Sequence, residues 1–227
     1  MNILTVHFNT PRLTEALVRS INKHTQGCKV YVFDNSDKHP FTEHFPNVEV
    51  IDNTKGQVID FDKMLDEYLY KVGTVNKWGS AKHCKSVDVC MDIIPEGFIL
   101  IDSDMLVFND LSPWWDEGYA YAGEVRVTKK HPVKIPRLWP FLCYINAPMC
   151  REYGIRYFNG EYMWKLVAES PNQWYDTGAW FLEDCKRKGL VGKEIHRSDY
   201  AIHFGGGSWM GKNNSSIWLD EHKELWQ

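Results

Sequence analysis

One stretch constrains this chain more than any other. Four apolar residues, Phe98 to Ile101, run into two aspartates one residue apart, Asp102 and Asp104. An uninterrupted apolar run of this length predicts a strand buried on both faces, as in a parallel sheet. Side chains at i and i+2 of an extended segment point the same way, so both carboxylates reach one point at the end of that strand. Open α/β sheets bind ligands at this edge, and carboxylate oxygens suit Mg²⁺ or Mn²⁺. The alternative is a solvated turn that Asp102 caps.

The pattern before this stretch predicts the fold class. Strands are expected at 3–8, 30–33, 48–51 and 98–101, and helices beginning at Pro11, Phe61 and Ser80. Thr10 suits the N-cap of the first helix, and Pro11 suits its first turn. Strand and helix alternate from residue 3 to 104, which is typical of βαβ units around a mainly parallel sheet.

The second half has a different pattern. Strands are expected at 119–125 and 141–146, a basic loop at 128–137, and a helix from Thr177 to Lys188 that begins near Asp176 and ends at Gly189. His203 stands just before the run Gly205 to Gly207. There is no internal repeat and no clear linker, so 227 residues are expected to form one domain.

Composition excludes several classes of protein. A net charge of -4 argues against a nucleic-acid binder, which usually has a basic balance. No apolar run approaches the roughly 20 residues of a membrane span, and the first residues do not read as a signal peptide. The six cysteines are scattered without a C-x-x-C pair, which favours reduced core residues in a cytoplasmic protein.

The order of these features resembles the GT-A-type glycosyltransferases, the nucleotide-sugar-dependent group that includes many family-2 bacterial enzymes. The resemblance rests on Phe8-Asn9-Thr10, Asp34-Asn35-Ser36, Ser80 with His83, Asp102-Ser103-Asp104, and His203. It implies a single α/β domain over 1–227 with a Rossmann-like, mainly parallel sheet flanked by helices. Residues 1–110 are then the nucleotide-binding half, and residues 111–227 are a smaller acceptor-binding half.

The resemblance also implies roles for residues. The acidic triplet holds Mn²⁺ or Mg²⁺ against the diphosphate of the donor, with Asp104 and His203 as metal ligands and Asp102 binding the metal through water or the ribose. An imidazole ligand shifts the preference toward Mn²⁺. The expected donor-binding residues are Phe8, Asn9, Thr10, Asp34, Asn35, Ser80, His83, Asp102 and Ser103.

Each of these assignments has a structural alternative. His203 is a metal ligand or a histidine held by a backbone carbonyl. Asp34 hydrogen-bonds a uracil ring N–H or forms an Asx-turn at the strand end. The run Gly205 to Gly207 is a lid whose amides meet phosphate or a surface loop that needs positive φ angles.

The acceptor side is less specified. Lys129 and Lys130 steer an anionic donor, lie on an anionic membrane surface, or are solvated loop charges. Trp174 and Trp209 are candidates to stack on an acceptor sugar. Asp176 is either a helix N-cap or the general base that activates the attacking hydroxyl, with Asp199 as the next candidate for that base.

The resemblance implies a metal-dependent glycosyltransferase, a hexosyltransferase by expectation, that uses a nucleoside diphosphate sugar, with UDP as the expected nucleotide. The expected acceptor is the hydroxyl of a saccharide or lipid-linked saccharide, in surface polysaccharide synthesis in the cytoplasm at the inner face of the membrane. One rival is a sugar-nucleotide nucleotidyltransferase, but the loop after the first strand lacks the glycines of that class. The other is a noncatalytic nucleotide- or carbohydrate-binding protein of the same fold.

Overall fold

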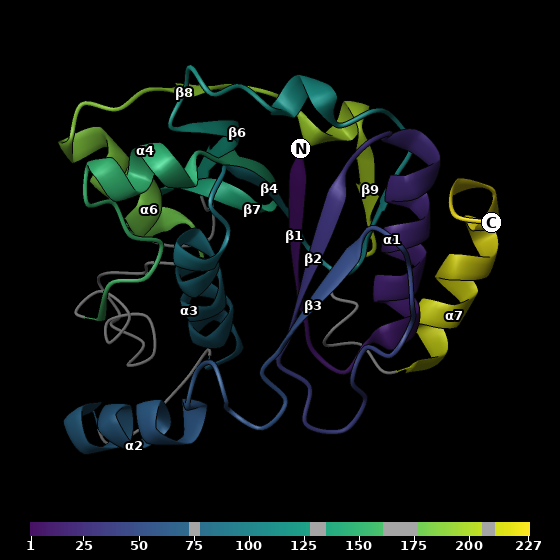
Figure 1. The fold of residues 1–227 in the computed structure, drawn as a ribbon, viewed down its shortest axis with the longest axis horizontal. Coiled ribbons are helices and arrows are strands. Elements are labelled where there is room, and N and C mark those ends of the chain that lie inside the picture. The colour runs from purple at the N-terminus through teal and green to yellow at the C-terminus, as the bar shows by residue number, and fades with distance from the viewer. Residues whose placement is uncertain (73–77, 128–134, 161–176, 206–211) are drawn as a thin grey trace.

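A seven-stranded sheet forms the centre of the protein (Figure 1). The computed structural model describes residues 1–72, 78–127, 135–160, 177–205 and 212–227. The strand order is β3-β2-β1-β4-β7-β6-β8. The bounds are β1 Asn2–His7, β2 Lys29–Asp34, β3 Val48–Asp52, β4 Phe98–Ile101, β6 Tyr121–Val127, β7 Pro136–Ile145 and β8 Gly192–Lys193. Strands β1 to β4 pair in parallel, β7 is antiparallel to β4 and β6, and β8 is parallel to β6. The expected α/β fold with a mainly parallel sheet is confirmed.

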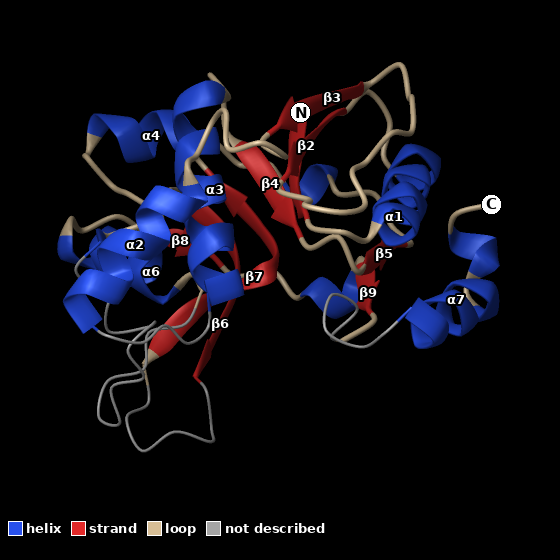
Figure 2. Ribbon diagram, turned by 90° about the horizontal axis from the view of Figure 1, so that it is seen from below, coloured by secondary structure: helices blue, strands red, loops and turns tan. Residues whose placement is uncertain are grey.

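A second, two-stranded sheet pairs β5 (Met105–Val107) with β9 (Ala201–His203) in antiparallel fashion. The α-helices of the described residues are α1 Pro11–His24, α2 Phe61–Val72, α3 Trp78–Ile93, α4 Ala147–Glu152, α6 Ala179–Arg187 and α7 Lys212–Glu221. Short 3₁₀ turns are η1 Ser112–Trp114, η2 Arg197–Asp199 and η3 Lys223–Leu225. Figure 2 shows the small sheet beside α1, apart from the strands of the main sheet.

Two apolar layers cover the faces of the main sheet, because buried strand residues alternate between them. On one face, Leu17 and Ile21 of α1 pack with Ile3 of β1 and Ile99 of β4. On the other face, α3, α4 and α6 pack against neighbouring strand positions such as Leu100. Figure 1 shows the same arrangement, with α1 and α7 on one side and α3, α4 and α6 on the other. This helix–sheet–helix layering leaves the carboxyl ends of β1, β2 and β4 at one edge.

Several boundaries differ from the sequence expectation. Helix α3 begins at Trp78 and not at Ser80, and β7 begins at Pro136 and not at residue 141. Strand β7 continues through Pro140 because the pairing with β6 shifts register between Gly123 and Val125, and proline is tolerated at such irregularities. The expected basic loop therefore ends before residue 136.

Helix α6 begins two residues later than expected, at Ala179. Its N-cap is Gly178, whose φ is 80°. A Cβ added there would lie 2.2 Å from the backbone oxygen of Leu138, so only glycine fits this contact with β7. The expected end of the helix at Gly189 is confirmed, with φ 71° at that glycine.

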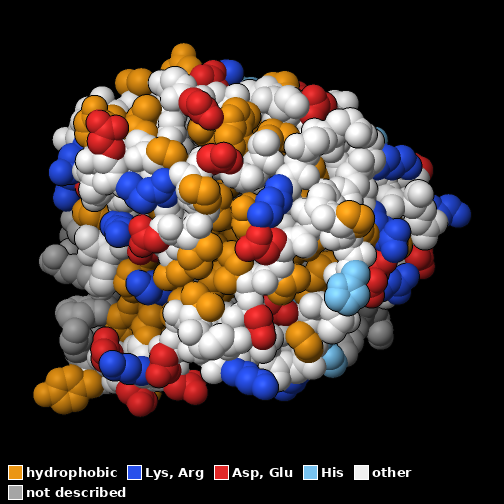
Figure 3. Space-filling view, in the orientation of Figure 1, with side chains coloured by type: hydrophobic (Ala, Val, Ile, Leu, Met, Phe, Trp, Pro, Cys, Tyr) orange, Lys and Arg blue, Asp and Glu red, His pale blue; other side chains and the backbone are white. Residues whose placement is uncertain are grey.

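The six cysteines are buried and form no disulfide with one another, as the sequence predicts: Cys28, Cys84, Cys90, Cys143, Cys150 and Cys185. Among the described residues, none of the helices is long and apolar enough to cross a membrane. On the face drawn in Figure 3, basic and acidic side chains are interspersed among apolar ones.

Candidate metal and donor site

Asp102 and Asp104 lie where β4 leaves the sheet. All four residues of β4 are buried, and the chain then turns sharply, since the amide of Met105 donates to the carbonyl of Asp102 at 3.2 Å. The amide of Asp102 donates to the carbonyl of Phe141 on β7 at 3.0 Å. The Asp102 side chain is 22% exposed and that of Asp104 is 8% exposed. The sheet therefore fixes two carboxylates at its edge, one partly exposed and one nearly buried.

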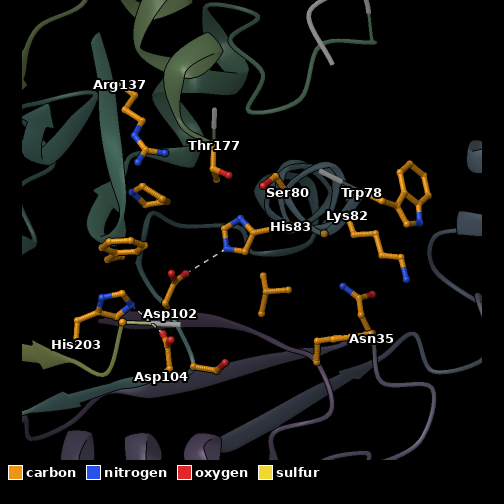
Figure 4. Close-up of a pocket in the computed structure, with 17 residues that line it drawn as sticks. Asn35, Trp78, Ser80, Lys82, His83, Asp102, Asp104, Arg137, Thr177 and His203 are labelled. Carbon is orange, nitrogen blue, oxygen red and sulfur yellow. Dashed lines mark hydrogen bonds and ion pairs between the residues drawn. The ribbon is translucent and has the colours of Figure 1, made fainter. Parts of the chain in front are cut away.

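The β5–β9 sheet brings His203 to these aspartates across 99 residues of sequence. Met105 pairs with His203 in the ladder, and the amide of Phe204 donates to the carbonyl of Asp104 at 3.0 Å. His203 Nε2 lies 3.1 Å from Asp104 Oδ1. The imidazole ring stacks on Phe141 with 4.0 Å between ring centres, which orients it toward the carboxylates (Figure 4).

The three side chains fit a divalent cation. One ligand atom from each of Asp102, Asp104 and His203 lies within 4.8 Å of the others. Ligands on opposite sides of a cation at 2.0–2.1 Å are about 4.2 Å apart, so small side-chain rotations bring all three into range. Two carboxylates and one imidazole suit Mn²⁺ or Mg²⁺, and the imidazole favours Mn²⁺.

A cavity of about 800 Å³ opens at this point. The metal candidates lie on its floor, together with Ser103 and His83. The rest of its lining includes Val6, Phe8, Asn35, Trp78, Ser80 and Lys82 from the first half of the chain. It also includes Arg137, Pro140, Phe141, Thr177 and Gly205 from the second half. Figure 4 shows Arg137 and Thr177 on one side of Ser80 and His83, and Asn35, Trp78 and Lys82 on the other side.

The cavity brings together most of the residues predicted from the sequence. Those that line it are Phe8, Asn35, Ser80, His83, Asp102, Ser103, Asp104 and His203. Asn35 is held firmly, since its amide nitrogen donates to Ser86 at 2.8 Å and its oxygen accepts from Asn53 at 2.9 Å. His83 Nε2 lies 3.4 Å from Asp102 Oδ1.

Asp34 is the clearest departure from the predicted site. It is 2% exposed and does not line the cavity. Its carboxylate accepts from the amide of Ser36 at 2.9 Å and from the amide of Phe41 at 2.8 Å. This is the Asx-turn alternative, because both oxygens hold the loop that follows β2. The Asp34 carboxylate therefore binds backbone amides of this loop, and the adjacent Asn35 is the residue that faces the cavity.

Asn9 and Thr10 also lie outside the cavity lining. Asn9 has a φ of 56°, and its side-chain oxygen accepts from the amides of Lys38 and His39. Thr10 occupies the N-cap of α1 without a side-chain capping hydrogen bond. Both residues shape the loop after β1, which presents Phe8 to the cavity.

Sequence reasoning missed several lining residues. Lys82 Nζ lies 5.2 Å from the centre of the Phe8 ring and 5.3 Å from that of Phe61. On the sequence it reads only as a solvent-facing position of a helix. The sequence gives no signal for Trp78, because it precedes Ser80, where the pattern predicts that the helix begins. Arg137 was expected in a loop, and its strand position brings it to the cavity.

Some predicted residues lie outside the described ranges. These are Lys129, Lys130, Trp174, Asp176, Gly206, Gly207 and Trp209. Thr177, which directly follows Asp176, lines the cavity. Asp199 is exposed in η2 and does not line the cavity.

Cys143, whose thiol is influenced by the Asp102 carboxylate, is not a nucleophile. Cys143 is fully buried on β7, and burial first and the Asp102 carboxylate second raise its pKa well above the usual range. Because the thiolate is the reactive form, this thiol stays inert at neutral pH. The chemistry of the cavity therefore rests on carboxylates, imidazoles, hydroxyls and cationic side chains.

Comparison with known proteins gives similarity in fold. No family model matches the sequence, and no curated protein matches it. Among solved structures, galactosyltransferase LgtC in complex with donor and acceptor sugar analogs is 13% identical with a TM-score of 0.52, over 87% of this chain and 74% of that one. Glycosyltransferase GlyE of Streptococcus pneumoniae TIGR4 is 11% identical with a TM-score of 0.52, over 99% of this chain and 64% of that one. The bifunctional glycosyltransferase WbbM is 11% identical with a TM-score of 0.50, over 86% of this chain and 38% of that one. The described part of the chain therefore adopts a GT-A-like glycosyltransferase fold.

Proposed function

We propose that this protein is a metal-dependent glycosyltransferase that moves a hexosyl group from a UDP-sugar to the hydroxyl of a saccharide or lipid-linked saccharide. The observation that carries the proposal is the meeting of Asp102, Asp104 and His203 in one cavity at the carboxyl edge of a parallel sheet. That edge is where open α/β sheets bind ligands. The GT-A-like fold supports the same conclusion. We place the reaction in the cytoplasm, at the inner face of the membrane, in surface polysaccharide synthesis.

The metal-binding side chains account for activation of the leaving group. Asp104 and His203 would hold the cation directly, and Asp102 would hold it directly or through water. When bound, Mn²⁺ or Mg²⁺ acts as a Lewis acid that neutralises charge on the departing diphosphate. His83 lies 3.4 Å from Asp102 and orients that carboxylate toward the floor of the cavity.

The end of the cavity opposite Arg137 suits the nucleotide. Phe8 is 40% exposed and offers a ring face to the base, and Trp78 also lines the cavity. Lys82, near the Phe8 ring, supplies a cation for the anionic donor. Asn35 reads the edge of the base with the amide hydrogen and lone pair that its two hydrogen bonds leave over.

The other end suits the acceptor, and we propose Asp176 as the general base. Thr177 follows it in the chain and lines the cavity. A carboxylate that accepts the proton of the attacking hydroxyl contributes a factor of roughly 10²–10⁴ in rate. Asp176→Asn is expected to lower transfer by that factor and to leave the affinity for UDP unchanged.

A screen of nucleotide sugars tests the proposal. Purified protein with Mn²⁺ is expected to release UDP from one UDP-sugar, and addition of a saccharide acceptor is expected to increase that release. EDTA is expected to abolish it. Nucleotide binding without release of UDP from any donor would identify a noncatalytic binding protein. If no nucleotide binds with Mn²⁺ present, the proposed function is wrong.

A further inference from the structure

Two buried side chains hold the amide of Asn35 at the cavity. Asn35 follows β2, is 7% exposed and lines the cavity. Its nitrogen donates to Ser86 Oγ on α3 at 2.8 Å, and its oxygen accepts from Asn53 Nδ2 at 2.9 Å. Asn53 directly follows β3, and both Asn53 and Ser86 are buried. We call Asn53, Asn35 and Ser86 the amide relay, because hydrogen bonds link them in series.

The backbone fixes the direction of the hydrogen bonds at the Asn53 end of the relay. Asn53 Oδ1 accepts from the amide of Val58 at 2.9 Å and from that of Ile59 at 2.7 Å. A backbone amide only donates, so the oxygen of Asn53 faces these two groups and its NH₂ group faces Asn35. That NH₂ group in turn requires the oxygen of Asn35 as its acceptor.

The Ser86 end of the relay has the same direction. Ser86 Oγ donates its single hydrogen to the carbonyl of Lys82 at 2.8 Å. A carbonyl only accepts, so the hydroxyl offers Asn35 a lone pair and no hydrogen. A half-turn of the Asn35 amide would therefore bring two NH₂ groups together at Asn53 and two acceptors together at Ser86. Backbone groups at both ends thus lock one orientation of the amide.

The relay leaves one hydrogen and one lone pair of Asn35 for a ligand in the cavity. An amide has two hydrogens and two oxygen lone pairs, and the relay uses one of each. Among the described residues, the Asn35 side chain has no further hydrogen-bond partner. Uracil presents the N3–H donor beside the O4 acceptor, whereas cytosine presents the N3 acceptor beside the N4–H donor. In a given pose of the nucleotide, a locked amide pairs with one of these two edges.

We propose that Asn53 and Ser86 are positioning residues that set the base preference of the donor site by locking the Asn35 amide. The inference rests on the proposed function, which places the base against Asn35. The wrong pyrimidine brings two donors or two acceptors face to face, and unpaired buried groups of this kind lower affinity by about tenfold or more. Because the proposed donor carries uracil, UDP is expected to bind more tightly than CDP.

Reversal of the relay tests the inference. Asn53→Asp keeps an acceptor for the amides of Val58 and Ile59, but it replaces the NH₂ group with a second oxygen. Donation by these amides keeps the carboxylate ionised at about pH 8. Its second oxygen requires a hydrogen from Asn35, so the Asn35 amide makes a half-turn and the Ser86 hydroxyl donates to it. In calorimetry with Mn²⁺, the ratio of UDP to CDP affinity is expected to fall by about tenfold or more.

Two further measurements do not depend on that variant. Ser86→Ala removes the lone pair that holds the NH₂ group of Asn35. The ratio of UDP to CDP affinity is expected to fall, though less than in Asn53→Asp, because Asn53 still holds the oxygen. On the wild type, 3-methyl-UDP lacks the N3 hydrogen and is expected to bind about tenfold or more weakly than UDP.

Matched substitutions away from the cavity serve as controls. Asn47→Asp changes an asparagine that also pairs with an asparagine side chain, that of Asn22 at 2.7 Å. Ser20→Ala removes a buried hydroxyl on α1 that donates to the carbonyl of Leu17 at 2.8 Å. Neither Asn47 nor Ser20 lines the cavity, so both variants are expected to keep the wild-type ratio. The melting temperature of each variant verifies that it folds.

The outcomes separate this inference from the proposed function. Equal binding of UDP and CDP to the wild type overturns the inference alone. So does a ratio that the folded Asn53→Asp and Ser86→Ala variants leave unchanged, which is the result for a relay that only stabilises the fold. A wild-type preference for CDP that Asn53→Asp reverses supports the lock and overturns UDP as the donor nucleotide. If neither nucleotide binds with Mn²⁺ present, the proposed function is wrong and the inference fails with it.

Discussion

Replacing Asp104 with asparagine separates the cation site from the fold. The Asp104 side chain is 8% exposed, and its Oδ1 lies 3.1 Å from His203 Nε2. Asparagine has the same shape and keeps an oxygen for His203, but it removes one of the two negative charges that a cation needs. Because the ligand atoms of Asp102 and Asp104 lie within 4.8 Å, the variant also relieves repulsion between carboxylates. Without cation, we expect its melting temperature to equal or slightly exceed that of the wild type.

The size of the expected loss follows from linkage. A ligand at a hundredfold excess over its Kd stabilises the native state by about 2.7 kcal/mol. With an unfolding entropy of about 2.1 cal/mol/K per residue, a chain of 227 residues gains about 6 °C in melting temperature. Loss of a supporting group around a metal lowers its affinity by about 10–100-fold, and we take the upper end for a direct ligand. The cation-dependent gain then falls to about 0.4 kcal/mol, or about 1 °C.

A thermal unfolding assay measures the cation-dependent gain in melting temperature, with UDP and Mn²⁺ at fixed concentrations and with EDTA as the blank. Asp66→Asn is the control. Asp66 is an exposed acid on α2, so this substitution removes the same charge at a position away from the cavity. His203→Ala is expected to lose the gain as Asp104→Asn does. If Asp104→Asn keeps a gain of about 6 °C, Asp104 is not a metal ligand and the geometric argument fails.

Two further substitutions test other parts of the structure. Asp34→Asn leaves one of the amides of Ser36 and Phe41 facing an NH₂ group, so we expect the free energy of unfolding, measured in urea, to fall by about 1–3 kcal/mol. The preference for UDP over CDP is expected to stay unchanged. A changed preference would show that Asp34 contacts the base. Burial raises the pKa of Asp88 from 3.8, so the stability that its protonated form contributes is fully present below pH 3.8 and is lost as the pH rises through the raised pKa. Asp88→Asn keeps an oxygen for the amides of residues 157–158 and is expected to flatten that part of the stability–pH curve, whereas a curve with the wild-type slope would contradict the assignment.

The fold was predictable where its signals are local. The apolar run of β4 is four residues long, and the segment from Asp102 to Asp104 that follows it is three residues long. Burial of the strand and the shared direction of the two carboxylates therefore follow from the strand itself. The alternation of strands and helices in the first half is equally local. In the second half, Pro140 hid the length of β7, because only the register shift against β6 makes a proline acceptable there.

The candidate site was predictable only in part, because its members meet through tertiary pairing. Nothing in the spacing of Asp104 and His203 indicates their 3.1 Å contact, which the β5–β9 ladder creates. Asp34 and Asn35 are adjacent, and which of them faces the cavity depends on the amides that Asp34 captures from the loop after β2. The position of Arg137 at the cavity depends on the register of the β6–β7 pairing.

The β5–β9 ribbon has a consequence for how the chain holds together. A cation shared by Asp104 and His203 closes a loop of 99 residues by a bond that is reversible. Cross-links that close long loops restrict the unfolded chain most, by several kcal/mol for a loop of about 100 residues in the chain-entropy model. A cation bound there would act as a removable cross-link between Asp104, which directly precedes β5, and His203 at the end of β9. Exchange of the amide of Phe204, which donates to the carbonyl of Asp104, would then report whether the cross-link is in place.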